Sequence, residues 1–390
     1  MKLRRLPEDF RVEELTQVSP DGGDFALYRL TKRSLGTLEA IEALLRRWKV
    51  QRARISFGGL KDRHAVTSQF VTILRGPRRG LRQEHLQLEY LGQTDRPFEP
   101  RDIGGNRFDI VVRSLSEAEV ARSESALPVA VHDGVPNYFD DQRFGSLGES
   151  REFIARAWCL GDYERALWLA LAEANPHDRP EDREEKDVLR EHWGQWDHCR
   201  ELLQRSPRLN IVDFLASRPK DFRGALARIR VDQRGLYLAA FQSALWNRML
   251  AELLRETCDA DQLLHVEVGQ ESHPFPRTLS DSQREALHAA ELPLPTARSR
   301  HEAGPHAELM RRVVAAEGLE VRQLRVKYPR DSFFSKGQRP AFVVPQILTA
   351  SAEADDLYPS RRKLRLQFEL PRGSYATIVI KRLMIDCAAY

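Results

Sequence analysis

The chain has 390 residues, 42% of them hydrophobic, so it can bury a large core and is long enough for two domains. Its net charge of +4 is too small to establish a polyanionic partner by itself. The four cysteines form no C-x-x-C pair, which argues against zinc ribbons and disulfide frameworks and favours a reducing cytoplasm. Without an apolar run of about 18 residues or a start that looks like a signal peptide, the protein is expected to be soluble and cytoplasmic.

The first long pattern begins at Asp24 and reads DFALYRLTKRSLGTLEAIEALLRRW. It predicts a strand, a basic turn and then a helix whose apolar residues recur at helical spacing. Thr37 is the expected N-cap, and Glu39 suits the positive end of the helix dipole. This helix is expected to be scaffold for the core.

A Gly-rich turn follows in FGGLKDRHAVTSQF, from Phe57 to Phe70, between two patterns typical of strands. Asp62 lies there between Lys61 and Arg63. Neighbouring positive charge favours an ionised carboxylate, and a carboxylate can form a covalent intermediate at a sugar or ring carbon without a metal. The alternative is an Asp that bonds its own turn or makes a surface ion pair, and the tripeptide alone favours this alternative.

A further strand is predicted from Asn106 in NRFDIVVRSL, and a helical or mixed region then leads to GVPNYFDDQRFG. In this second motif Asn137 offers an amide that can donate and accept, as reading a base edge requires. Phe139 offers a flat face, and Arg143 a fork that can bind phosphate. Together these residues could hold an extruded base. The alternative, favoured for Phe144 taken alone, is an aromatic turn packed into the core.

Helical periodicity dominates beyond about Ser150, in REFIARAWCLGDYERALWLALAEA and in LYLAAFQSALWNRMLAELLRE. The acidic stretch NPHDRPEDREEKD between them is expected to be an exposed loop of a separate helical domain. His192, His198 and Cys199 lie close together in sequence, but their spacing lacks the usual pattern of metal ligands. We therefore interpret WGQWDHC as a tryptophan-rich packing patch, with no metal.

Strand patterns return near the end of the chain, in AFVVPQIL from Ala341, in KLRLQFELP and in SYATIVIKRLM, and are expected to rejoin the first sheet. Two basic clusters flank strands of this α+β sheet domain. RGPRRGLR from Arg75 has four arginines in eight residues, and residues 360–383 contain seven Lys or Arg against one acid. Each cluster alone could be a solvated face, but their placement favours a nucleic-acid groove in or beside the sheet domain.

Six motifs resemble those of the TruD family of pseudouridine synthases and occur in the family's order along nearly the whole chain. They are PEDFRVEE, GGLKDRHAVTSQ, GGNRFDIVV, PNYFDDQRFG, AFQSALWN and FELPRGSYAT. The resemblance implies a pseudouridine-synthase α+β fold, with a mixed, largely antiparallel sheet, flanking helices and a mostly helical insertion domain. The expected boundaries are 1–152 and 346–390 for the catalytic domain and 153–345 for the insertion.

The implied activity is isomerisation of a uridine in RNA to pseudouridine without a cofactor or metal. In the family's bacterial branch the substrate is tRNA, at uridine 13, and the resemblance makes Asp62 the nucleophile that forms a covalent adduct. Whether it attacks the ribose or the base first is left open. Motif matching makes Phe10, Asn137 and Tyr375 substrate-pocket residues. Their expected neighbours and basic partners are Phe139, Arg143, Gln69, Lys61 and Arg4. We expect a monomer with tRNA as its partner.

Three departures from the family pattern are visible. Asp140 replaces the Gly that usually follows NYF and adds negative charge beside a pocket meant for RNA; Gly36 replaces an Asn, and Tyr375 a Phe. Asp140 keeps open an alternative of another class, an RNA-binding module that has lost the chemistry. A hydrolase with an Asp nucleophile is the third reading, weakened because no metal cluster or second paired carboxylate is evident.

Overall fold

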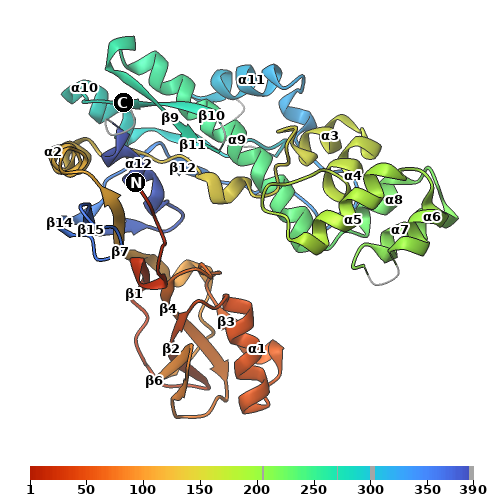
Figure 1. Cartoon of the computed structure of the whole chain (residues 1–390), viewed down its shortest axis with the longest axis horizontal. Coiled ribbons are helices and arrows are strands. Elements are labelled where there is room, and N and C mark those ends of the chain that lie inside the picture. The colour runs from red at the N-terminus through yellow and green to blue at the C-terminus, as the bar shows by residue number, and fades with distance from the viewer. Residues whose placement is uncertain (204–205, 270, 299–303, 386–390) are drawn as a thin grey trace. The chain divides into compact units, whose positions relative to one another are not determined.

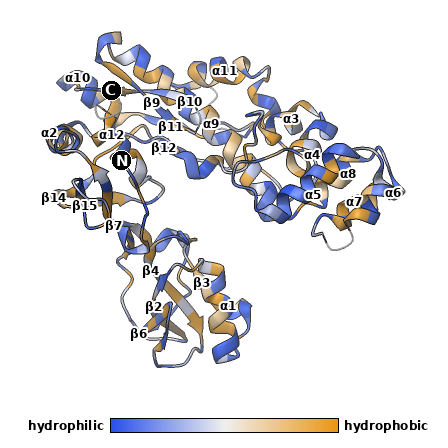
Figure 2. Ribbon diagram, in the orientation of Figure 1, coloured by the Kyte–Doolittle hydropathy of each residue, from blue (hydrophilic) through white to orange (hydrophobic). Residues whose placement is uncertain are grey.

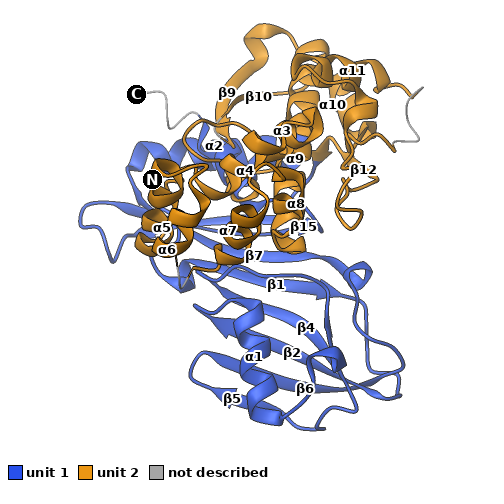
Figure 3. Cartoon of the chain, turned by 90° about the vertical axis from the view of Figure 1, so that its right-hand side faces the viewer, with its two compact units in different colours: residues 1–135, 343–390 blue, residues 136–342 orange. Residues whose placement is uncertain are grey.

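The computed structural model describes residues 1–203, 206–269, 271–298 and 304–385 (Figure 1). The chain divides into two compact units (Figure 3). Residues 1–135 and 343–390 form the first, here called the sheet unit, and residues 136–342 form the second, called the insertion unit. The first boundary lies before PNYFDDQRFG, which therefore belongs to the insertion unit, whereas the sequence patterns placed it in the catalytic domain. Cys387 lies outside the described residues.

Nine strands of the described chain form one sheet, in the order β14-β15-β7-β1-β4-β2-β6-β5, with β3 paired to β4 (Figure 3). Only the β1–β4 pair among these described strands is parallel. The strands are β1 (Phe10–Thr16), β2 (Phe25–Arg33), β3 (Ile55–Phe57), β4 (Val66–Leu74), β5 (Leu81–Gln83), β6 (Leu86–Thr94), β7 (Ile103–Leu115), β14 (Gln346–Ala354) and β15 (Arg362–Pro371). The predicted mixed, largely antiparallel sheet is confirmed, and so is the return of the last segment to it.

Helix α1 (Thr37–Trp48) covers part of this sheet because its apolar stripe matches the alternating apolar face of two strands. Ala40, Ile41 and Leu44 pack in one cluster with Tyr28 and Val71. Figure 2 shows both hydrophobic and hydrophilic residues along α1, as this one-sided burial requires. The sheet unit also contains α2 (Glu117–Asp133), α12 (Ala376–Leu383) and the 3-10 turns η1 (Pro7–Asp9), η2 (Arg52–Arg54) and η3 (Pro100–Asp102).

Two local predictions in this unit are wrong. The N-cap of α1 is Gly36, not Thr37, because the Thr37 hydroxyl bonds a distant loop instead of the helix start. SYATIVIKRLM, read as a strand from its β-branched residues, forms helix α12. There Ala376, Val379 and Leu383 recur at helical spacing and are all buried, so tertiary burial overrides the local β propensity.

The insertion unit is mostly helical, as predicted. Its helices are α3 (Ile154–Leu160), α4 (Tyr163–Leu171), α5 (Pro180–Glu191), α6 (Trp196–Leu202), α7 (Leu209–Ser217), α8 (Phe222–Ala227), α9 (Val231–Thr257), α10 (Asp281–Ala289) and α11 (Ala307–Ala316), with 3-10 turns η4 (Asp141–Phe144), η5 (Ala260–Gln262) and η6 (Val321–Gln323). Antiparallel pairs join β9 (Leu263–Val268) to β10 (Glu271–Pro276) and β11 (Glu291–Pro293) to β12 (Gln338–Pro340). The chain passes between the units at β8 (Val135–Pro136) and β13 (Phe342–Val343).

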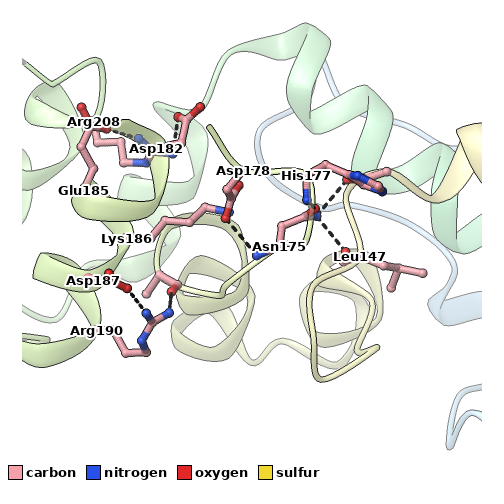
Figure 4. A network of polar contacts seen from close by, with 12 residues as sticks. Leu147, Asn175, His177, Asp178, Asp182, Glu185, Lys186, Asp187, Arg190 and Arg208 are labelled. Atoms are coloured by element: carbon pink, nitrogen blue, oxygen red, sulfur yellow. Dashed lines mark hydrogen bonds and ion pairs between the residues drawn. The ribbon is translucent and has the colours of Figure 1, made fainter. Parts of the chain in front are cut away.

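The acidic stretch of the insertion unit is not the exposed loop that its charge suggested, because most of it forms α5. Its acids are matched by bases of the same unit. Lys186 binds Asp178 at 2.8 Å, and Arg208 binds Asp182 at 3.2 Å and also Glu185 (Figure 4). The stretch is therefore a helix held by local ion pairs, although each partly exposed pair contributes only about 0 to 1 kcal/mol.

The tryptophan-rich stretch packs as predicted. Trp196 is buried, and its ring centroid lies 4.9 Å from that of Trp193; Cys199 is buried in the same helix. In the part of the chain that the structure describes, no group of three or more His, Cys, Asp or Glu is arranged to hold a metal ion. No described helix combines the length and the apolar composition needed to cross a bilayer.

Candidate active site

Asp62 lies on the loop of residues 58–65, which joins β3 to β4. The two strands pair antiparallel, with Ile55 opposite Ile73 and Phe57 opposite Val71, so both ends of the loop are fixed by the sheet. A Cβ on Gly58 would lie 2.5 Å from the side chain of Ile103, which explains the glycine at the start of the loop. The Asp62 side chain is 20% exposed and can therefore meet a substrate.

Lys32 of β2 binds the backbone of this loop through its side-chain ammonium. It ends the inward face of β2 and is only 1% exposed. Its ammonium donates to the carbonyl oxygens of Asp62 at 2.7 Å, Lys61 at 3.2 Å and Leu35 at 2.6 Å. Burial lowers the pKa of Lys32 to about 8, while the nearby charges of Asp62 and Glu39 oppose this shift.

Thr37 and Gln69 hold the same loop from α1 and β4. The backbone N–H of Lys61 donates to the Thr37 hydroxyl at 2.9 Å, and this hydroxyl donates to the Gln69 amide oxygen at 2.9 Å. The Gln69 amide nitrogen donates to the carbonyl of Gly59 at 3.0 Å. Because Gln69 is fully buried and both ends of its amide are bound, it supports the loop, whereas the sequence placed it next to substrate.

The Asp62 carboxylate accepts a hydrogen bond of 2.9 Å from the guanidinium of Arg4. Arg4 has a left-handed backbone, with φ of 54°, and its guanidinium lies 4.0 Å from the ring centroid of Phe10. The Phe10 ring is buried and meets Phe108 edge to face at 6.4 Å. Phe10 therefore supports the cation that pairs with the candidate nucleophile, through a cation–π contact.

The two cations that flank Asp62 in sequence are engaged with other carboxylates. The Lys61 ammonium lies 3.0 Å from a carboxylate oxygen of Glu14, and the Arg63 guanidinium lies 3.0 Å from Glu39. The ion pair that the structure shows for Asp62 is with Arg4, which is remote in sequence, and the effect of Lys61 and Arg63 on the charge of Asp62 stays a prediction.

A buried ion pair fixes the N-terminal segment that carries Arg4 and Phe10. Arg113 of β7 binds Asp9 at 2.9 Å and Asp355 at 3.0 Å, and its bond to Asp9 raises the pKa of its guanidinium. Asp9 also accepts from the backbone N–H of Leu6 at 2.9 Å. Lys2 exchanges two backbone hydrogen bonds of 2.8 Å with Arg113. The PEDF motif is thus anchored to the sheet before and after Arg4.

Tyr375 lies in the sheet unit, at the residue that precedes α12. It is half-buried, and its carbonyl accepts from the backbone N–H of Ile378 at 3.1 Å. Tyr375 is the partly exposed residue among the predicted pocket aromatics, since Phe10 and Phe139 are buried.

Asn137 belongs to the insertion unit and is 3% exposed. Its amide nitrogen donates to the carbonyl of Pro340 at 3.0 Å, and its amide oxygen accepts from Arg339 at 2.6 Å. An amide has two N–H donors and two lone pairs, so each end keeps capacity for one further bond. The role of Asn137 in reading a base stays a prediction.

Phe139 is held in the insertion unit by the side chain of Asn247, which binds both its backbone N–H and its carbonyl at 2.8 Å. Its ring meets Trp246 edge to face at 5.5 Å and lies under the guanidiniums of Arg339, at 4.2 Å, and Arg143, at 5.4 Å. At 8% exposure it offers little free face, so its role as a stacking partner remains a prediction.

Phe144 and Asp140, which lie near Phe139 in the sequence, are both buried. Phe144 is buried, and a Cβ on Gly269 would lie 2.4 Å from its ring, so the packing alternative is confirmed for Phe144. Asp140 is buried as well, and its carbonyl accepts from the backbone N–H of Arg143 at 2.8 Å. The Asp that stands in place of the family's Gly is therefore a buried residue and not an exposed one.

The basic cluster at residues 360–383 is less available to a polyanion than its sequence suggests. Lys363 binds Asp356 at 2.6 Å, and Arg365 binds Asp109 at 2.5 Å. Arg362 lies 3.3 Å from Glu117. Three of the seven cations of this cluster are therefore paired with acids of the same unit.

Sequence reasoning missed Lys32 and the hydroxyl of Thr37. A signal for Lys32 was present, because the alternation in β2 places it on the same face as the apolar Ala26, Tyr28 and Leu30. A lysine on the buried face of a strand needs polar partners and so indicates a specific task.

Comparison with known proteins adds independent findings. The family model described as tRNA pseudouridine synthase D (TruD) matches residues 1–383. A Methanocaldococcus jannaschii protein named as a probable tRNA pseudouridine synthase D is 31% identical over 392 residues, covering 99% of this chain and 92% of that protein. The tRNA pseudouridine synthase D of Aquifex aeolicus is 29% identical over 395 residues, covering 98% of each.

A solved structure has the same fold. The crystal structure of a TruD protein from Methanosarcina mazei aligns with a TM-score of 0.72 and 23% sequence identity, covering 98% of this chain and 93% of that one. The match of the family model and of the relatives over nearly the whole chain defines a pseudouridine synthase, an isomerase that acts on tRNA. The chain belongs to the TruD family.

Proposed function

We propose that this protein converts uridine 13 of tRNA to pseudouridine, with Asp62 as the nucleophile. The observation that carries the proposal is that Asp62 is fixed in place: Lys32 binds its backbone carbonyl, and Arg4 binds its carboxylate. A nucleophile fixed before substrate arrives avoids the entropic cost of orienting it during the reaction. The substrate site and the mechanism are carried over from the motifs that this chain shares with the family.

The reaction proposed is an isomerisation, so atoms balance without a co-reactant. Asp62 forms a covalent bond to the ribose or the base while the glycosidic C–N bond breaks. The uracil turns and its C5 joins the ribose carbon; C5 then loses its proton, N1 gains one, and the bond to Asp62 breaks to release the aspartate. A base stacked in tRNA must first be extruded, at a cost of about a few kcal/mol that pocket contacts offset. Tyr375 and Asn137 are proposed to contact the base, with Phe10, Phe139, Arg143, Gln69, Lys61 and Arg4 as pocket residues or their supports.

A reconstituted assay tests this function. A tRNA transcript with uridine at position 13 is incubated with wild type, with Asp62→Asn and with Asp62→Ala, and pseudouridine is quantified by nucleoside mass spectrometry. We expect wild type to form pseudouridine and both variants to form none, with tRNA affinity within about twofold of wild type because one neutralised group near the RNA costs little. Activity of Asp62→Asn equal to wild type would refute the nucleophile, and binding without turnover by wild type would favour the RNA-binding module.

The proposal includes a monomer acting in the cytoplasm. Light scattering of the purified protein, alone and with tRNA, tests the monomer: a mass of one chain per tRNA is expected, and a stable dimer would contradict it.

A further inference from the structure

The insertion unit contains a cavity of about 550 Å³ that no sequence motif singled out. Its lining includes four cations, Arg298, Arg325, Lys327 and Arg330, and the exposed aromatic residue Phe333. We call these five residues the basic pocket. Unlike the basic cluster of the sheet unit, the four cations form no ion pair with any residue that the structure describes.

The nearest acid in the sequence does not neutralise the basic pocket. Asp331 is bound by Arg234 at 2.8 Å, and Arg234 is a buried residue of α9. The pocket cations therefore keep their charge available to a ligand, and such unpaired cations around a cavity create a positive potential that attracts polyanions.

The exposure of Phe333 is imposed by its neighbours. Ser332 is buried and accepts a hydrogen bond of 2.7 Å from Arg234, and the ring of Phe334 is buried in the unit. With both neighbours anchored inward, Phe333 is held outward and is 67% exposed. An aromatic ring fixed in water beside unpaired cations has the composition of sites that stack a base and bind its phosphates.

We propose that the basic pocket is an RNA-binding site, in which the four cations bind backbone phosphates and Phe333 stacks on an unpaired base. It rests on the proposed function only in taking tRNA as the RNA. An acidic polypeptide would satisfy the cations but would leave the ring without a flat partner, so the combination favours RNA.

Binding of fluorescently labelled tRNA, measured by anisotropy over a range of salt concentrations, tests the basic pocket. Lys327→Gln/Arg330→Gln should weaken binding about tenfold and reduce the slope of log Kd against log salt by about 2, one unit for each lost phosphate contact. Phe333→Ala should weaken binding about tenfold with an unchanged salt slope, and Phe333→Trp should restore it. The matched control is Arg230→Gln/Arg322→Gln, whose exposed cations are paired with Asp232 and Glu320.

Three outcomes would overturn the basic pocket. In the first, the test variants bind tRNA as tightly as the control variant does. In the second, the salt slope of the double variant equals that of wild type. In the third, polyglutamate displaces tRNA and Phe333→Ala binds tRNA as wild type does, which would indicate an acidic protein partner. Circular dichroism and melting confirm that each variant is folded. Because the assay needs no turnover, absence of pseudouridine formation does not affect its result.

A second, independent observation concerns Lys32. Its three donors are used by three carbonyls, two of them from consecutive residues of the nucleophile loop and one from Leu35, in the turn after β2. The charged groups around it are Asp62, Glu39 and Lys61. Burying an ammonium whose hydrogen bonds go only to backbone carbonyls costs desolvation free energy, and a neutral side chain of similar size would fill the space at a lower cost.

The geometry assigns Lys32 as a positioning residue, which fixes the backbone of Asp62 and so the direction of its carboxylate. It does not touch substrate. Its effect should appear in the chemical step, since a displacement of about 1 Å at a reacting group can cost about a hundredfold in rate.

Lys32→Met, which keeps the length of the side chain without its charge, tests this assignment on the full chain. We expect kcat to fall at least about tenfold while KM stays within about twofold. Wild-type kcat should fall above pH 8 as the ammonium deprotonates, and the variant should lack this fall. Lys220→Met, an exposed lysine of the insertion unit, is the matched control and should behave as wild type.

Two results would overturn the role of Lys32: an unchanged kcat in a folded Lys32→Met protein, or the same fall above pH 8 in wild type and variant. Hydrogen exchange of the peptide that covers residues 58–65 gives a second measurement, which does not require activity. Exchange should be faster in Lys32→Met, and equal protection would contradict the assignment even if no substrate is turned over.

Discussion

Arg4 pairs with Asp62 across 58 residues of sequence, through a hydrogen bond of 2.9 Å between guanidinium and carboxylate. This contact makes the N-terminal segment part of the site, because it joins the segment that carries PEDF to the loop that carries Asp62. Phe10 of PEDF supports the guanidinium, and Asp9 anchors the segment to β7.

The Arg4 side chain can be removed with little disturbance of its backbone. Arg4 has φ of 54°, a conformation that glycine and asparagine adopt more readily than alanine. We expect Arg4→Gly and Arg4→Asn to fold normally and to lose about tenfold or more in kcat/KM, because a charge-assisted bond of about 1.5 to 3 kcal/mol is lost. Arg4→Lys should retain part of the activity. Steady-state kinetics with tRNA check this, and full activity of Arg4→Gly would contradict the role.

Thr37 tests the support of the loop. Thr37→Val keeps the shape but leaves the N–H of Lys61 and the amide of Gln69 without their partner. We expect a loss of about 1 to 3 kcal/mol in the free energy of unfolding and a lower kcat. Thr37→Ser keeps the hydroxyl and should be close to wild type in both. Urea unfolding and single-turnover kinetics check this; a valine variant that matches the serine variant would count against the network.

Lys32 makes stability depend on pH in a defined direction. Its pKa is about 8 in the folded protein, below the ordinary 10.5, so the unfolded chain holds more protons between these values. Stability should therefore rise from pH 8 to pH 10.5 through this residue, while activity falls. The difference in unfolding free energy between wild type and Lys32→Met, followed by urea titration across this range, isolates the contribution. A difference independent of pH would show that the ammonium does not titrate there.

The buried Arg113 predicts a large effect on stability. Arg113→Met leaves Asp9 and Asp355 without their cation, and breaking a buried pair costs about 3 to 5 kcal/mol. Arg107→Met, in the same strand, removes a largely exposed pair with Glu369 and should cost less than about 1 kcal/mol. Thermal unfolding of the two variants provides the comparison. Equal losses would contradict a special role for the Arg113 cluster.

Much of this architecture could be predicted from the sequence, because the spacing of apolar residues in strands and amphipathic helices indicates which face of each element is buried. The strand β2, the helix α1 and the loop of Asp62 are examples. The errors have a common cause. In α5 and α12, contacts with residues distant in sequence stabilise a helix, although the charge of one stretch suggested a loop and the β-branched residues of the other suggested a strand. Lys32 was missed for the same reason, and Arg4 was predicted only as a basic pocket residue, since the partners of both meet them only in the folded chain.

The most direct test of the central claim is a map of pseudouridine at single-nucleotide resolution in tRNA from cells with the gene, without it, and with only Asp62→Asn. We predict that pseudouridine at position 13 is present with wild type and absent in the other two strains, at equal protein levels. Pseudouridine at position 13 in the Asp62→Asn strain, or in the strain without the gene, would contradict the account.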